Sequence, residues 1–455
     1  MTDATDTLVP VSRGTESNST DVDSLSPIAG YRREFESLRE VNDTREPEWL
    51  QSRRTAAIGM FEASGFPTMK DEDWHFTNVA PIAAKTFRLA PVSRRVHPEA
   101  VARLTFGQVW HSFVFVNGRF TPQDGSRNLP DGISVQSLSS EIASGGLSEE
   151  HFGKAAPSGE SAFTALNEAM TSDGALIRIE PNASIDTPIH LVFLSDASSD
   201  NGASHPRNII VAGTNSRCTV IESYASAGGE AYFTNAVSEV FLAEGANLSH
   251  YKLQNESPSA YHVGTIAVRQ ERSSRYESFS FATGADLSRT NVYTTLAGDG
   301  AEVVMNGLYM VDGKQHVDHQ TRIEHVAPNC PSHELYKGIL DGRSHGVFNG
   351  KVYVHPEAQK TDGKQSNNNL LLSDAAKVDT KPQLEIFADD VKCTHGATVG
   401  RLDETALFYM RSRGVGVAQA RRLLTYAFAA DVLEKIELEP LRDALEAQVL
   451  ARFTA

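Results

Sequence analysis

The feature that most limits what this chain can fold into is a long run of short apolar segments between Gly174 and Gly400. The segments alternate with polar turns rich in Gly, Asn, Asp and Pro, which is the pattern of strands joined by tight turns. From His316 to Gly400 the turns leave no room for crossover helices between the strands. The sequence therefore predicts a mainly β protein with its core at residues 173–400.

Several of these segments resemble one another and recur about every 27 to 30 residues, a period typical of solenoids. The similar segments begin at Gly245, Arg272, Gly300 and Asn329. Each coil of a solenoid leaves an unpaired sheet edge unless another coil stacks on it, so such units occur as a stack. A closed sandwich is the alternative, but roughly 200 residues of continuous short strands is long for one. We therefore predict a parallel β-helix core.

The region before this core has a different pattern. Residues 28–64 and 139–172 carry apolar positions at helical spacing, and Asn117-Gly118 in FVFVNGRF favours a type I′ hairpin turn. We therefore expect a mixed α/β N-terminal region at residues 28–172. Residues 1–27 are rich in Thr, Ser and Asp and lack an apolar segment, which predicts a disordered tail and not a signal peptide.

Residues 401–455 change to the helical period of about 3.6 residues. Pro440 is expected to open a second helix after a first, longer one. The apolar stripe of the first helix consists of Val417, Ala420, Leu424, Ala427, Phe428 and Val432. Such helices can cap the open end of the stacked coils or form a docking surface, and the sequence leaves both open.

Composition narrows the classes of partner. The net charge of −16 argues against nucleic acid as the main partner, because phosphate binding needs clustered Lys and Arg. The sequence has no run of about 18 apolar residues, so we expect no membrane segment. The three cysteines, Cys218, Cys330 and Cys393, lie far apart, which suits a reducing compartment better than a disulfide framework. We therefore expect a cytoplasmic protein.

The sequence lacks the common catalytic motifs. It contains no P-loop, no dinucleotide-binding fingerprint and no nucleophile elbow, so we expect no enzyme activity. A carbohydrate-active β-helix enzyme is a remote alternative, and it would need paired carboxylates along a groove. Asp389-Asp390 is the only acidic pair near the candidate region, and adjacent residues of a strand face opposite ways.

Cys393 and His395, in DVKCTHG, are the candidate site residues. Positions i and i+2 of a strand share a face, so the thiol and the imidazole would point the same way. A thiolate and an imidazole are suitable ligands for iron. The alternative is that Cys393 packs in the core, because free Cys is among the most buried residue types. His316 and His319 of HVDH would point to opposite faces, so we expect no metal site there.

Six longer motifs resemble the SufB/SufD family of the Suf iron–sulfur cluster assembly scaffold, and its D-type members in particular. They are DHQTRIEHVAP (from Asp318), SHELYKG (from Ser332), VFNGKVYV (from Val347), AQKTDGKQSNNNLLLS (from Ala358), KPQLEIFADDVKCTHGATVG (from Lys381) and FYMRSRG (from Phe408). The likeness extends more weakly to the N-terminal helices and EDWHFTN, so it covers most of the chain after the tail.

The resemblance implies a right-handed parallel β-helix between helical N- and C-terminal regions. It also implies a non-catalytic scaffold subunit that pairs with a SufB-like paralogue and binds a SufC-like ABC ATPase through its C-terminal helical region. Such a complex builds and transfers nascent clusters, and the family is further linked to iron supply and to reduced flavin. Whether the chain forms a homodimer when the paralogue is absent stays open.

The resemblance also implies roles for particular residues. His395 would lie at the interface with the SufB-like subunit, where the cluster is built, and Cys393 could share that role or only pack. The implied ATPase contacts lie in FYMRSRG and are Phe408, Tyr409, Arg411 and Arg413. The two arginines could instead cap the preceding backbone. The paralogous B-type subunit, which accepts sulfur on a cysteine further up its β-helix, stays open as an alternative, with Cys218 as the only candidate.

Overall fold

The computed structural model describes most of the chain. The described residues are 27–42, 46–85, 87–93, 98–122, 129–147, 149–196, 201–229 and 231–452. The predicted tail, residues 1–27, lies outside them except for Pro27, which begins the first helix.

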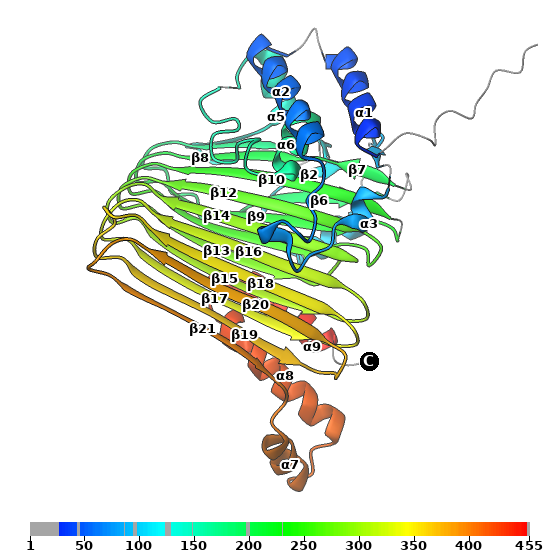
Figure 1. Ribbon diagram of the computed structural model, residues 1–455, viewed down its shortest axis with the longest axis vertical. Helices are drawn as coiled ribbons and strands as arrows, with labels where there is room; N and C mark the ends of the chain where they lie inside the picture. The colour runs from blue at the N-terminus through cyan, green and yellow to red at the C-terminus, as the bar shows by residue number, and fades with distance from the viewer. Residues whose placement is uncertain are drawn as a thin grey trace, which may run out of the picture.

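The described chain begins and ends with helices around a long series of strands (Figure 1). The helices are α1 (Pro27–Asn42), α2 (Glu48–Ser64), η1 (Glu72–Trp74), α3 (Ala80–Ala83), α4 (Pro98–Leu104), α5 (Leu138–Ser144), α6 (Ala162–Met170), α7 (Glu404–Ser412), α8 (Val417–Leu433) and α9 (Glu439–Arg452). The strands are β1 (Arg88–Leu89), β2 (His111–Val116), β3 (Arg119–Phe120), β4 (Ile133–Ser137), β5 (Ala175–Ile179), β6 (Ile189–Ser195), β7 (Gly202–Ser204), β8 (Arg207–Ala212), β9 (Arg217–Ser226), β10 (Tyr232–Leu242), β11 (Asn247–Asn255), β12 (Tyr261–Gln270), β13 (Arg275–Ala282), β14 (Leu287–Leu296), β15 (Glu302–Val311), β16 (His316–His325), β17 (Pro331–Leu340), β18 (His345–Val354), β19 (Asp362–Leu371), β20 (Lys377–Ile386) and β21 (Lys392–Gly400).

The strands form two sheets, and consecutive strands from β8 to β21 enter alternate sheets. Sheet A has the order β20-β18-β16-β14-β12-β10-β8-β5-β4, and sheet B has the order β21-β19-β17-β15-β13-β11-β9-β6-β2-β3. From β8 onward each strand pairs in parallel with the strand one coil away. A coil spans between 26 residues, as from Tyr261 to Leu287, and 32 residues, as from His345 to Lys377. The parallel β-helix predicted from the repeats is confirmed.

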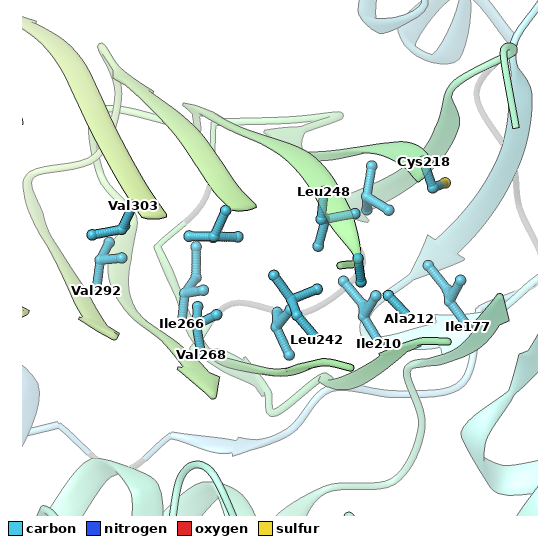
Figure 2. Close-up of a cluster of buried hydrophobic side chains, with 14 of the residues drawn as sticks. Ile177, Ile210, Ala212, Cys218, Leu242, Leu248, Ile266, Val268, Val292 and Val303 are labelled. Carbon is cyan, nitrogen blue, oxygen red and sulfur yellow. The ribbon is translucent and has the colours of Figure 1, made fainter. Parts of the chain in front are cut away.

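The main core lies between the two sheets. Inward-facing side chains such as Ile210, Leu248 and Val303 meet across this space in one buried apolar cluster (Figure 2). Because alternate residues of a strand face opposite ways, each strand also has an outward face that must be covered or solvated. Helical layers cover large parts of both outward faces.

The N-terminal region covers sheet A. Phe61 of α2 and Phe163 of α6 belong to one buried cluster with Phe233 of β10 and Tyr261 of β12. The region also extends the sheets themselves, because β2 pairs in parallel with β6 and β4 pairs in antiparallel with β5.

The local predictions for this region are confirmed in part. Asn117 and Gly118, with φ of 51° and 75°, form the predicted hairpin turn between β2 and β3. The prediction of helical structure at residues 139–172 is confirmed only for the stretches that form α5 and α6. Turns separate α5 from α6, and Gly145 ends α5 in the left-handed conformation that favours glycine.

The C-terminal helices α8 and α9 cover the outward face of sheet B. Val432 and Leu433 of α8 and Leu445 of α9 pack in one cluster with Leu253 of β11 and Leu308 of β15. End-capping by these two helices, one of the two options left by the sequence, is therefore not what the structure contains. The helix α7 lies beyond the last strands, at the bottom of Figure 1, apart from the sheets.

The apolar stripe predicted on the first C-terminal helix is wrong in part. Ala420 and Val432 are buried as expected, but Val417 and Ala427 are exposed. The buried residues of α8 also include Thr425, Ala429 and Leu433, which the predicted stripe does not contain. No helix of the described residues is long and apolar enough to cross a membrane.

Candidate functional site

The last coil of the β-helix is the most exposed part of its two sheets. In the described chain, β20 pairs only with β18 and β21 pairs only with β19, so each strand has one free edge. Most residues of β21 are exposed, and the exposed large apolar side chains at this end are Ile386, Phe387 and Val399. A free, partly apolar edge is a surface on which another chain can add strands.

Cys393 and His395 lie on β21 and face the space between the two sheets. The position that a Cβ would take on Gly363 lies 3.3 Å from the Cys393 Sγ and 3.7 Å from Cγ1 of Val352, which belongs to the opposite sheet. The Cys393 side chain is half-buried, and burial raises the pKa of its thiol. His395, two residues further on the same face, is exposed because no further coil lies over it. The predicted shared face of the two residues agrees with this geometry.

Two polar residues that were not predicted from the sequence precede His395 at the same register position, one coil and two coils before it. Gln365 of β19 is the register partner of His395, and Glu334 of β17 is the register partner of Gln365. The Gln365 Nε2 donates a hydrogen bond to Oε2 of Glu334 over 2.7 Å. Burial raises the pKa of Glu334 to about 7, although its hydrogen bonds act in the opposite direction. The sequence signal that could have found them is their separation by one coil repeat.

The four residues assigned to ATPase contact lie on a separate surface. Phe408 and Tyr409 of α7 are 70% and 56% exposed, which is unusual for large aromatic side chains. The Arg413 guanidinium lies over the Tyr409 ring, 4.5 Å from its centroid, and Arg411 is exposed. The candidate residues therefore form two groups, one on the last coil and one on α7.

The remaining histidines and cysteines do not extend this site. His316 contacts Thr77 on the outward face of sheet A, whereas His319 contacts Ser280 between the sheets, as expected from their i, i+3 spacing. Within the described residues, no group of three or more His, Cys, Asp or Glu side chains is placed to hold a metal ion. Cys330 is buried, and Asp390 of the acidic pair at 389–390 forms an ion pair with Lys360 in a turn.

The fold and the exposed residues of the last coil together define a class of protein. The described chain is a parallel β-helix flanked by helical regions, and its terminal coil has a free edge on each strand and carries a thiol and an imidazole. Comparison with known families agrees with this class. Residues 27–191 match the model described as SufBD protein N-terminal region, and residues 193–428 match the model described as SUF system FeS cluster assembly, SufBD core domain.

Full-length relatives show the same likeness. The chain is 33% identical to an iron–sulfur cluster assembly SufBD family protein of Synechocystis, over 92% of this chain and 95% of the relative. It is 32% identical to the iron–sulfur cluster assembly protein SufD of Escherichia coli, over 86% and 89% of the two chains. It is 27% identical to SufD of Bacillus subtilis, over 88% and 93%. The chain belongs to the SufBD family of the Suf iron–sulfur cluster assembly system.

Proposed function

We propose that this chain is a non-catalytic, D-type scaffold subunit, which pairs through its last coil with a SufB-like paralogue and builds a nascent iron–sulfur cluster at that junction. The observation that carries the proposal is the free edge of β20 and β21, with Cys393 and His395 on it. The membership of the family and the two relatives named SufD support the D-type assignment.

The free edge suits pairing with a second β-helix. Both strands of the last coil present unpaired backbone groups, and a partner with a similar open coil could continue both sheets by main-chain hydrogen bonds. The exposed Phe387 and Val399 would be buried in such a junction. The same edge would also allow two copies of this chain to pair when the paralogue is absent.

The two candidate side chains at the free edge are of types that bind iron and iron–sulfur clusters. An imidazole and a thiolate are ligands for iron–sulfur clusters, and each chain of a junction would contribute only part of the ligand set. The Cys393 thiol in the free chain is held protonated by its burial, so iron binding would have to displace its proton. Among the described residues, this chain has no metal-binding cluster of its own, so the partner would have to complete the ligand set.

The surface of α7 is the proposed contact with a SufC-like ATPase. Exposed aromatic side chains flanked by Arg are typical of the energetically dominant residues of protein interfaces, and Phe408, Tyr409 and Arg411 combine these types on one short helix. Iron supply and reduced flavin remain further predictions from the family, and a cytoplasmic location remains a prediction from the composition.

The B-type alternative is less compatible with the thiols. A sulfur-accepting cysteine must reach a donor as a thiolate. Cys218 is only 2% exposed, and burial raises the pKa of its thiol to about 12. Stoichiometric persulfide formation on the purified chain, supplied with its desulfurase, would support the B-type alternative instead.

The test is co-expression with the SufB-like and SufC-like subunits, followed by purification without oxygen. Complex mass and cluster absorbance are measured for wild type, His395→Ala and the control His333→Ala, which changes a histidine on the outward face of β17. We expect all three complexes to assemble and only His395→Ala to lose the cluster. Normal cluster content in His395→Ala would overturn the proposed site. Failure of the wild-type chain to assemble would overturn the proposed pairing.

A second comparison tests the ATPase surface. The double variant Phe408→Ala, Tyr409→Ala removes the exposed aromatic side chains of α7, and Met69→Ala removes an exposed apolar side chain far from it in the chain. Because the resemblance implies that the SufB-like subunit binds one ATPase copy of its own, we expect the complex of the double variant to contain one ATPase copy fewer, and that of Met69→Ala to be unchanged. An unchanged number of ATPase copies in the double variant would contradict the assignment.

A further inference from the structure

The inward face of sheet B carries a column of three polar side chains that ends at the open edge. His395 on β21, Gln365 on β19 and Glu334 on β17 occupy the same register position in three successive coils. In parallel strands, register partners lie side by side about 4.8 Å apart. The column therefore connects the exposed imidazole to a carboxyl group two coils inside the protein.

The amide of Gln365 is held in one orientation by its surroundings. Its Nε2 donates to Oε2 of Glu334 over 2.7 Å, and both side chains are buried, with exposures of 2% and 5%. Gly350 faces this amide from sheet A, and a Cβ at that position would collide with Nε2. The absence of a side chain at Gly350 thus provides the space that the amide occupies.

The carbonyl oxygen of the same amide has no hydrogen-bond partner among the described residues. Among the described residues, Oε1 of Gln365 is a buried acceptor without a hydrogen bond. Leaving a buried acceptor unpaired is costly, so such atoms in folded proteins usually have a partner or a function. Because Nε2 is committed to Glu334 in the preceding coil, Oε1 is the atom available to the following coil, where His395 is the direct neighbour.

We infer that Gln365 is a positioning residue for His395: its Oε1 accepts the N–H of one imidazole nitrogen and leaves the other nitrogen free to bind iron, while Glu334 fixes the amide. This inference rests on the proposed function of His395. The structure places acceptor and ring on neighbouring strands without a bond between them, and the exposed ring reaches the acceptor by rotating its side chain. Histidines that bind metals generally donate their second ring N–H to a carbonyl or carboxylate oxygen, which fixes the tautomer.

The first test measures the tautomer of His395 in the purified full-length chain. Histidine is labelled with 13C, the ring signals of His395 are assigned by their loss in His395→Ala, and the 13Cδ2 and 13Cε1 shifts are followed across pH. We expect one dominant neutral tautomer in wild type and a mixture like that of free histidine in Gln365→Leu. The control Asn367→Leu removes a buried amide of the same strand whose register partner is Ala397, and should leave the His395 signals unchanged.

A rescue variant separates positioning from general loosening of the coil. The exchanged pair Glu334→Gln with Gln365→Glu keeps one amide donor between the two positions and an acceptor oxygen next to His395. We expect this pair to restore the wild-type tautomer. Wild-type His395 signals in Gln365→Leu, or equal changes in Gln365→Leu and Asn367→Leu, would overturn the inference.

The second test uses the co-purified complex with the SufB-like and SufC-like subunits. Loss of the partner of a ligating histidine typically lowers metal affinity or activity by about 10-fold or more, so Gln365→Leu should slow cluster formation from added Fe²⁺ and sulfide by about 10-fold. The two tests have independent outcomes, because the first measures the ring and the second measures cluster formation. A tautomer that responds as expected, together with normal cluster formation in His395→Ala, would overturn the proposed function and leave the positioning of the ring in place.

Discussion

Glu334→Gln should make the free chain more stable above neutral pH, although it replaces a buried hydrogen-bonded group. Burial raises the pKa of Glu334 from 4.5 to about 7, so the folded state binds the proton more tightly than the unfolded state does. The stabilising contribution of the protonated carboxyl is therefore complete below pH 4.5 and is lost as the pH rises through 7. The amide of glutamine is uncharged throughout this range and still accepts a hydrogen bond from Gln365.

The size of the effect follows from the two pKa values. Their difference corresponds to about 3 kcal/mol in the free energy of unfolding. The carboxyl meets uncharged groups, the Gln365 amide and the Thr321 hydroxyl, so no neighbouring charge of opposite sign compensates its ionisation. We expect wild type and Glu334→Gln to be about equally stable at pH 4.5, and the variant to be more stable by about 2–3 kcal/mol at pH 8.

The measurement is equilibrium unfolding by urea at a series of pH values between 4.5 and 8. The control is Glu357→Gln, which makes the same charge change at an exposed position. The difference between Glu334→Gln and wild type should grow with pH over this window, while the control should follow wild type. A difference that is constant with pH, or that grows as the pH falls, would refute the burial of an uncompensated carboxyl at Glu334.

Three further predictions concern other parts of the chain. A thiol reagent applied to the folded protein should modify half-buried Cys393 well before buried Cys218, as peptide mass mapping will show, and the reverse order would contradict the placement of β21. Lys337→Met should destabilise the packing of α8 on sheet B by about 1–2 kcal/mol, because the buried ammonium donates a hydrogen bond to an α8 carbonyl 3.0 Å away. The measurement is limited proteolysis, in which the C-terminal helices of the variant should be cleaved earlier than those of wild type. Gly307→Ala should cost about 1–3 kcal/mol in urea unfolding, since the added Cβ collides with the Tyr336 ring, and a neutral effect would mean that the core there is loosely packed.

The β-helix could be predicted because its determinants repeat. A strand of one coil, such as that beginning near Gly245, reappears one period later with the same alternation of apolar and polar residues, and only stacking satisfies its edges. The hairpin at Asn117-Gly118 was predictable for the same kind of reason, because positive φ at both turn residues is a local requirement. These features depend on residues close in sequence or related by a fixed spacing.

The docking of the C-terminal helices depends on a distant surface, and the sequence did not specify it. The apolar stripe on 417–432 predicted a buried face, but Val417 is exposed, whereas Ala429, which the stripe did not contain, is buried in the cluster against sheet B. The outward apolar residues of sheet B, such as Leu253 and Leu308, decide which face is buried. Periodicity within one helix therefore shows that a face is buried and not which element covers it.

The column at the open end shows a different limit. Cys393 and His395 were predicted as site residues because thiols and imidazoles bind metals. Glu334 and Gln365 belong to residue types that usually lie on protein surfaces. Their separation by one coil repeat was a signal in the sequence, but only the register of three coils shows that they point inward, since a shift of one residue would turn each side chain outward.

The placement of polar residues inside the last coils is itself physically informative. Buried polar groups lie between the sheets in earlier coils, where Ser238 donates to Glu222, as well as near the end, where Gln365 donates to Glu334, but only those near the end lie beside free strand edges. An interior of this kind gains less stability from apolar burial, and its unpaired atoms favour any contact that satisfies them. The last coil therefore combines free strand edges with an unsatisfied interior. Both features favour association with a partner that supplies strands and hydrogen-bond donors, and they are the physical basis for the proposed pairing at the edge that carries His395.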